Sequence, residues 1–112
     1  MNYPQDQIDE LNVICPGARR HDEGGATYFY LPGLRLPEGC NPGTLDALLC
    51  PTAHHGYTSR LLFGRQFSSP QQRNWHYSAR VAERNWQAIS WNIPDPNMRL
   101  AQLLACHLRA FR

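Results

Sequence analysis

The sequence predicts an α+β domain in which an antiparallel strand meander packs against C-terminal helices. Before about Phe67, short alternating or aromatic runs are separated by Pro and Gly turns, a pattern typical of consecutive antiparallel strands. After about Gln71 the breakers thin out, and the last segment repeats its leucines at helical spacing. Strands first and helices afterwards is the α+β order. At 112 residues, with 42% hydrophobic and 18% charged residues, the chain predicts one domain over residues 1–112.

The N-terminal part is predicted as a short helix, a strand and a loop. Ile8 and Leu11 favour a short helix or turn over Gln5–Asn12. The apolar run Leu11–Cys15, which breakers follow, favours a strand. The charged stretch Ala18–Gly25 is expected to be a loop that ends in a diglycine turn, as a hairpin needs.

Three more strands are predicted before the pattern changes. Ala26–Leu31 is rich in aromatic residues and should form a strand that Pro32-Gly33 breaks. Thr44–Cys50 alternates apolar and polar residues, which indicates a half-buried strand. Arg60–Phe67 is expected to be the last strand, interrupted by Gly64.

The second half is expected to be mainly helical. Gln71–Arg84 lacks breakers and is interpreted as a helix or a partly ordered loop. Trp86–Trp91 should be the aromatic anchor between the sheet and the helical half, because large aromatic residues bury the most area. A final helix is predicted with Asp95 as N-cap and Pro96 at its first position. Its apolar stripe comprises Leu100, Leu103, Leu104, Leu108 and Phe111.

Charge and composition narrow the classes of partner. The net charge of +2 is small and the basic residues are scattered, so neither nucleic acid nor a membrane is an expected partner. The N-terminal residues carry no basic leader and no apolar segment, which favours a cytoplasmic protein. In that compartment the four cysteines should be free thiols.

All 11 basic residues are arginine, and lysine is absent from the chain. Arginine-biased codon usage is the favoured explanation. The functional alternative is a protein that handles an activated acyl group, because a lysine amine can capture such a group and a guanidinium cannot.

Cysteine and histidine residues in the middle of the chain suggest a zinc site, but their spacing does not support one. Cys40 and Cys50 are separated by nine residues, whereas zinc modules pair their cysteines two to four residues apart. His54 and His55 are expected to be surface loop residues. No metal site and no cofactor is predicted. Cys40 is the most exposed thiol candidate for a nucleophile, and Cys106 is expected to pack in the core.

Three stretches together resemble a known family. They are Tyr30–Gly39, Asp46–Pro51 with Gly56-Tyr57, and Trp86–Ser90. In their order and spacing they are similar to the small bacterial ubiquitin-conjugating-enzyme-like proteins called prokaryotic family E, of the UBC superfamily. The resemblance covers about Leu11 to Phe111. It implies a reduced UBC fold and a place in a bacterial ubiquitin-like conjugation pathway, with a ubiquitin-like protein and its activating-type enzyme as partners.

The resemblance also has departures. The family's Tyr-Pro is Tyr57-Thr58 here, and Trp91-Asn92 stand where the family has Arg-His. Well-known members carry a nucleophilic cysteine after the last strand, and Phe67–Asn85 contains none. The first hypothesis is acyl transfer. Because the expected cysteine is missing, a hydroxyl would hold the C-terminus of the ubiquitin-like protein as an ester.

Ser90 is the first choice for that hydroxyl and Ser78 the second. A serine needs a base to become nucleophilic, so His76 is the candidate base for Ser78. Asn92 is the candidate oxyanion donor near Ser90.

The second hypothesis is a non-catalytic binding module of the same fold. Aromatic and arginine residues dominate binding hot spots, so Tyr28, Tyr30 and Tyr57 are its expected contacts. The matched Trp-Gln stretch adds Trp86, Gln87 and Trp91 to the binding candidates. A third alternative is an unrelated α+β domain with a toxin or scaffold role.

Overall fold

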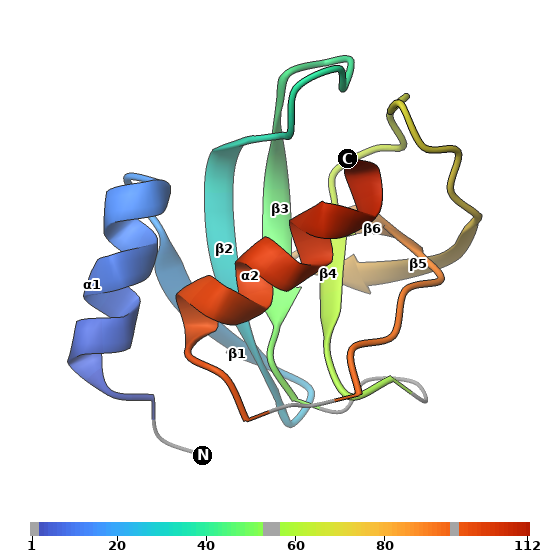
Figure 1. Ribbon diagram of the computed structural model, residues 1–112. Helices are drawn as coiled ribbons and strands as arrows, with labels where there is room; N and C mark the ends of the chain where they lie inside the picture. The colour runs from blue at the N-terminus through green and yellow to red at the C-terminus, as the bar shows by residue number, and fades with distance from the viewer. Residues whose placement is uncertain (1–2, 53–56, 95–96) are drawn as a thin grey trace.

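The computed structural model describes residues 3–52, 57–94 and 97–112, and these residues form an α+β fold (Figure 1). An N-terminal helix is followed by a six-stranded antiparallel sheet and a C-terminal helix that packs against it. The elements are α1 (Gln5–Ile14), β1 (Arg19–Glu23), β2 (Ala26–Arg35), β3 (Thr44–Cys50), β4 (Arg60–Phe63), β5 (Trp75–Val81), β6 (Arg84–Ile89), α2 (Leu100–Leu108) and a short 3-10 helix, η1 (Arg109–Phe111).

The strands lie in the order β1-β2-β3-β4-β6-β5, and each pairs with its neighbour antiparallel. The first four form the predicted meander. The last two form a hairpin whose second strand joins β4. β1 and β5 are therefore the edges of the sheet.

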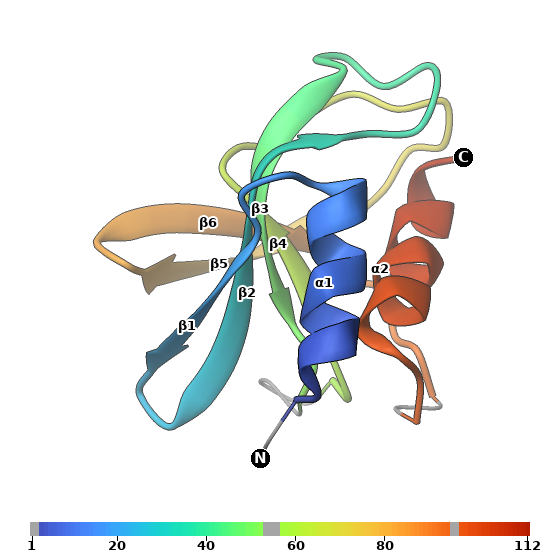
Figure 2. The ribbon, with the colours of Figure 1, turned by 90° about the vertical axis from the view of Figure 1, so that its left-hand side faces the viewer.

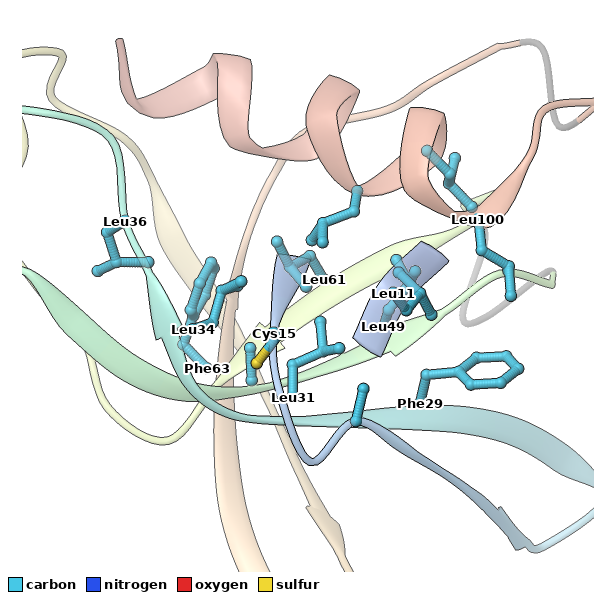
Figure 3. Packing of buried hydrophobic residues seen from close by; sticks show 14 of the residues in the cluster. Leu11, Cys15, Phe29, Leu31, Leu34, Leu36, Leu49, Leu61, Phe63 and Leu100 are labelled. Atoms are coloured by element: carbon cyan, nitrogen blue, oxygen red, sulfur yellow. The ribbon is translucent and has the colours of Figure 1, made fainter. Parts of the chain in front are cut away.

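Both helices cover the same side of the sheet, where they lie side by side (Figure 2). Between helices and sheet lies the first core, in which Phe29 and Leu31 of β2 meet Leu11 and Leu100 of the two helices (Figure 3). On this side Phe111 contacts the rings of Phe63, Phe67 and Trp75, with centroid distances of 5.5, 4.7 and 6.0 Å.

The opposite side of the sheet, called here the helix-free side, has a second core of its own. Strong twist carries the β5–β6 hairpin out on this side (Figure 2), as sheet twist allows. The buried residues of the second core are Tyr28, Leu48, Cys50, Leu62, Val81, Trp86 and Ala88. Strands β2, β3 and β4 are thus covered on both faces, and the prediction that Thr44–Cys50 is only half-buried is wrong.

The predicted strand Leu11–Cys15 is wrong, because this run is the end of α1. Only one of its first four residues, Leu11, is buried, and Val13 and Ile14 are 83% and 49% exposed. Ile8, Leu11 and Cys15, which pack in the first core, follow one another at helical spacing and do not alternate as in a strand.

Two breaks expected near β2 are also wrong. The expected charged loop contains β1, which pairs with β2 across the predicted diglycine turn. β2 continues through Pro32-Gly33 by a register shift between Leu31 and Leu34. A bulge accommodates a proline that cannot donate to the ladder, and the Asp46 carboxylate accepts the Gly33 N–H at 2.8 Å instead.

The predicted helix Gln71–Arg84 is wrong, since Trp75–Val81 form β5 and the residues that follow form the turn into β6. In β5, Tyr77, Ala79 and Val81 pack in the second core and alternate with exposed Ser78, which is strand periodicity. Ala82 and Glu83 form the two-residue turn with φ of 52° and 63°. Such turns normally carry Gly or Asn, so neither residue here signals a turn.

In the described residues, one C-terminal α-helix and the short 3-10 helix η1 after it stand where helices were expected. α2 begins at Leu100, whose N–H donates to the Gln7 side chain at 3.0 Å. Its N-cap is Arg99, and the predicted cap Asp95 with Pro96 lies outside the described residues. The expected leucine stripe is otherwise confirmed, although Leu108 is only partly buried.

Candidate functional site

Ser90 lies exposed directly after β6, on the helix-free side of the sheet. Along β6, Trp86 and Ala88 pack in the second core and Ile89 packs in the first. Side chains alternate along a strand, so Ser90 points to the same side as Trp86 and Ala88. Its N–H donates to the carbonyl of Asn74 at 3.1 Å, which fixes the end of the strand.

The fold brings Tyr57 to Ser90, with the two hydroxyl oxygens 2.8 Å apart. The Tyr57 ring packs on the guanidinium of Arg60, and so does the ring of Tyr77, each centroid 4.1 Å from the guanidinium carbon. Tyr57, Arg60, Tyr77 and Ser90 are called the Ser90 cluster below. They come from the approach to β4, from β4, from β5 and from the end of β6.

Burial sets the electrostatics of this cluster. Arg60 is only 3% exposed, and this burial lowers its pKa, but an arginine stays charged at neutral pH. Burial also raises the pKa of Tyr77, so this phenol stays protonated. The result is a fixed positive charge behind a pair of hydroxyls, of which Ser90 is open to solvent. Hydroxyls in this setting can donate hydrogen bonds to an incoming carboxylate.

The remaining catalytic candidates do not join Ser90. Ser78 pairs with Gln87 across the hairpin and points to the opposite face from Tyr77, so it is turned away from Ser90. His76 is exposed at a register shift in β5, and its Nδ1 lies 3.4 Å from the Asn74 carbonyl. Asn92 is exposed, and no hydrogen bond joins it to Ser90 in the described part of the chain.

A base that could activate Ser90 is therefore missing from residues 3–52, 57–94 and 97–112. In these ranges no histidine or carboxylate hydrogen-bonds the Ser90 hydroxyl, whose side-chain partner is Tyr57. His54 and His55 lie outside the described residues. The described arrangement holds and orients a ligand better than it performs nucleophilic attack.

The predicted binding residues divide into two groups. Trp86 is 1% exposed and donates its indole N–H to the Val81 carbonyl at 2.9 Å, so it is part of the second core. Trp91 packs against α2 and donates to the Cys106 carbonyl at 3.3 Å. Tyr57 is half-buried in the Ser90 cluster, and Tyr30 is half-buried beside Trp86. Gln87 is partly buried within the hairpin.

A buried Ser59–His107 pair escaped the sequence analysis. The Ser59 hydroxyl lies 2.9 Å from His107 Nε2, and the two side chains are 0% and 4% exposed. Burial, aided by the nearby charge of Arg60, lowers the pKa of His107 to about 4. A pair without access to solvent cannot attack a macromolecule, so its role is structural. The sequence contains a sign of this pair, because His107 falls on the apolar stripe of the final helix.

The thiols are free, as expected. Burial raises the pKa of Cys15, Cys40 and Cys50, which keeps these thiols protonated and poor as nucleophiles. Within the described residues, no group of three His, Cys, Asp or Glu side chains is close enough to hold a metal ion.

Comparisons of the chain with protein-family profiles, with curated proteins and with solved structures give no match. In the part of the chain that is described, neither helix has the length and apolar character that crossing a membrane requires.

Proposed function

We propose that the protein is a UBC-like component of a bacterial ubiquitin-like conjugation pathway that holds the C-terminal tail of a ubiquitin-like protein at the Ser90 cluster. One observation carries the proposal most directly: Ser90 Oγ is exposed and lies 2.8 Å from Tyr57 Oη. These two residues come from two of the three stretches that resemble prokaryotic family E.

The surroundings of this hydroxyl pair suit a carboxylate-ended tail. Arg60 contributes a buried positive charge next to the Tyr57 ring. Hydrogen bonds from neutral donors to an ionised acceptor are among the stronger ones. Tyrosine, tryptophan and arginine are also the residue types that dominate binding hot spots.

Positioning without a covalent bond is the first form of this proposal, because the described residues supply no base for Ser90. The second form is acceptance of the tail as an ester on Ser90. The exposure of Ser90 and the absence of lysine from the chain support this second form.

The experiment incubates the protein with a candidate ubiquitin-like protein, its activating-type enzyme and ATP, and measures both complex formation and covalent adducts. Holding the tail predicts a complex that Tyr57→Phe weakens about tenfold, because one hydroxyl donor is lost. Ser78→Ala is the matched control, since Ser78 faces away from the cluster. An unchanged affinity in Tyr57→Phe and in Ser90→Ala would overturn the site.

The adduct test separates the two forms. An adduct that hydroxylamine cleaves, that thiols leave intact and that Ser90→Ala abolishes supports the ester. A thiol-labile adduct that Cys40→Ala abolishes contradicts the serine assignment. A complex without any adduct supports the non-catalytic form.

A further inference from the structure

A second concave site lies on the helix-free side of the sheet, outside the Ser90 cluster. It is a hollow of about 190 Å³ between the β1–β2 and β5–β6 hairpins, and it is called the Arg19–Arg84 hollow here. Its lining residues are Arg19, His21, Tyr30, Leu48, Ala82, Arg84 and Trp86.

The hollow has an apolar base and a charged rim. Leu48 and Trp86 are each 1% exposed, and the Tyr30 ring stands edge-on to Trp86 with centroids 6.3 Å apart. At the rim, the guanidinium of Arg19 lies 4.8 Å from the Tyr30 ring centroid, and that of Arg84 lies 4.5 Å from the Trp86 ring. Stacking restrains both arginines and leaves the N–H donors of Arg19 available.

One carboxylate ties the two walls together. Glu23 Oε1 lies 2.9 Å from His21 Nε2 on its own strand and accepts the backbone N–H of Ala82 at 3.0 Å across the hollow. Ala82 and Glu83 both adopt positive φ without being glycine, and such strain persists only where surrounding contacts enforce it. The wall of the hollow is therefore built in advance of any ligand.

Arg19 is the rim cation that has no carboxylate partner among the described residues, whereas Glu23 bonds to His21 and to the Ala82 N–H. Arg84 is neutralised by Asp46 at 3.0 Å. Partial burial acts to raise the pKa of Asp46, but hydrogen bonds from Gly33, Arg84 and Tyr30 outweigh it and lower the pKa, so this carboxylate stays ionised.

We propose that the Arg19–Arg84 hollow binds an apolar group that carries a single carboxylate, with the carboxylate on Arg19 and the apolar part over Leu48 and Trp86. One guanidinium without a carboxylate partner matches a single carboxylate better than a doubly charged phosphate. A guanidinium presents paired donors that fit a carboxylate. The volume is below the roughly 300 Å³ at which ordinary ligand pockets begin, so one ring or one side chain fills it.

A free organic acid and the last residue of a polypeptide share this chemistry. The edge position of β1, which supplies Arg19 and His21, leaves room for a chain to continue beside the rim. The proposal does not depend on the Ser90 cluster, with which the hollow shares no residue.

The test is an NMR titration of the ¹⁵N-labelled protein, followed at the Trp86 indole N–H and the Ala82 amide. The probes are N-acetyl-phenylalanine, its C-terminal amide, a heptapeptide that ends in phenylalanine with a free carboxylate, and inorganic phosphate. Saturable shifts are expected with the free acids, and about tenfold weaker binding with the amide, because the charge-assisted hydrogen bonds are lost.

Arg19→Ala should weaken the binding of the free acids to the level seen for the amide. Arg80→Ala removes the same charge on the opposite face of β5 and should leave binding unchanged. Equal affinity for acid and amide, tighter binding of phosphate, or no shift at millimolar N-acetyl-phenylalanine would each overturn the proposal. Binding of the heptapeptide at least as tight as that of the small acid assigns the ligand to a chain end, and exclusion of the heptapeptide assigns it to a free acid.

Discussion

At the scale of single residues, His107 shows how burial changes the chemistry of a side chain. It lies on α2 among leucines, and the Ser59 hydroxyl and the Arg60 guanidinium are its polar neighbours. The positive charge of Arg60 opposes protonation, and so does the loss of solvent. The native protein therefore holds His107 neutral.

This arrangement makes the free energy of unfolding depend on pH. The native pKa of about 4 lies below the ordinary 6.5, so the unfolded chain binds a proton more readily. Stability should then fall by about 2 kcal/mol as pH drops from 7 to 5. Urea unfolding at the two pH values measures this change.

His107→Gln should flatten that dependence, because glutamine can bond Ser59 without titrating. His76→Gln is the matched control at an exposed position and should retain the slope of the unchanged protein. A slope that survives in His107→Gln would contradict the assignment to this residue.

Also at this scale, the aromatic anchor expected around Ser90 is confirmed only in part. Trp86 and Trp91 are largely packed, one in the second core and one against α2. They position Ser90 and do not present themselves to a partner. Tyr30, Tyr57 and Gln87 are predicted binding residues that remain partly accessible to a partner.

At the scale of elements, the β5–β6 hairpin is the part of the fold that sequence reasoning misjudged most. Its turn residues, Ala82 and Glu83, are both ordinary helix formers placed at positive φ. The hydrogen bond from the Ala82 N–H to Glu23 and the packing of Val81 and Trp86 hold the turn. Tertiary contacts thus override local preference.

Glu83→Gly should stabilise the protein by about 0.5–1 kcal/mol, because glycine adopts positive φ without steric cost. The gain is measured as a higher urea midpoint. Ser78→Gly, in the middle of β5, should lower the midpoint by a similar amount. A loss of stability in Glu83→Gly would mean that the turn stores no strain.

At the scale of the whole molecule, two cores share one sheet. β2, β3 and β4 bury residues on both faces, so the helices and the β5–β6 hairpin stabilise the same three strands from opposite sides. Unfolding either layer exposes the strands that the other layer needs. The molecule should therefore unfold in one cooperative transition.

Phe111→Ala tests this coupling. The ring touches Phe63, Phe67 and Trp75, and a fully buried phenylalanine is worth about 3–5 kcal/mol when truncated. The far-ultraviolet circular dichroism and the NMR signal of the Trp86 indole N–H should report the same transition, since Trp86 lies in the second core. Val13→Ala, at an 83% exposed position, should change stability by less than about 0.5 kcal/mol.

Non-coincident transitions in Phe111→Ala would show instead that the two layers unfold separately. In that case the native Trp86 indole signal would persist after the helical circular dichroism signal is lost.

The sequence by itself determined the α+β class, the strand Thr44–Cys50 at both its ends, and the apolar stripe of the last helix. These are local patterns: alternation and helical spacing act over a few residues. It also selected Ser90 and Tyr57, although nothing in the chain order places residues 33 positions apart in contact.

Only the tertiary structure decided that β5 and β6 are strands, that Ser78 faces away from Ser90, and that Arg19 and Arg84 line one hollow. Each of these depends on the twist of the sheet and on contacts between distant segments. The strand at Tyr77–Val81 is favoured over a helix because its side chains are buried against Leu48, Cys50 and Leu62. These residues are distant in the chain, so a local sequence pattern does not reveal the contact.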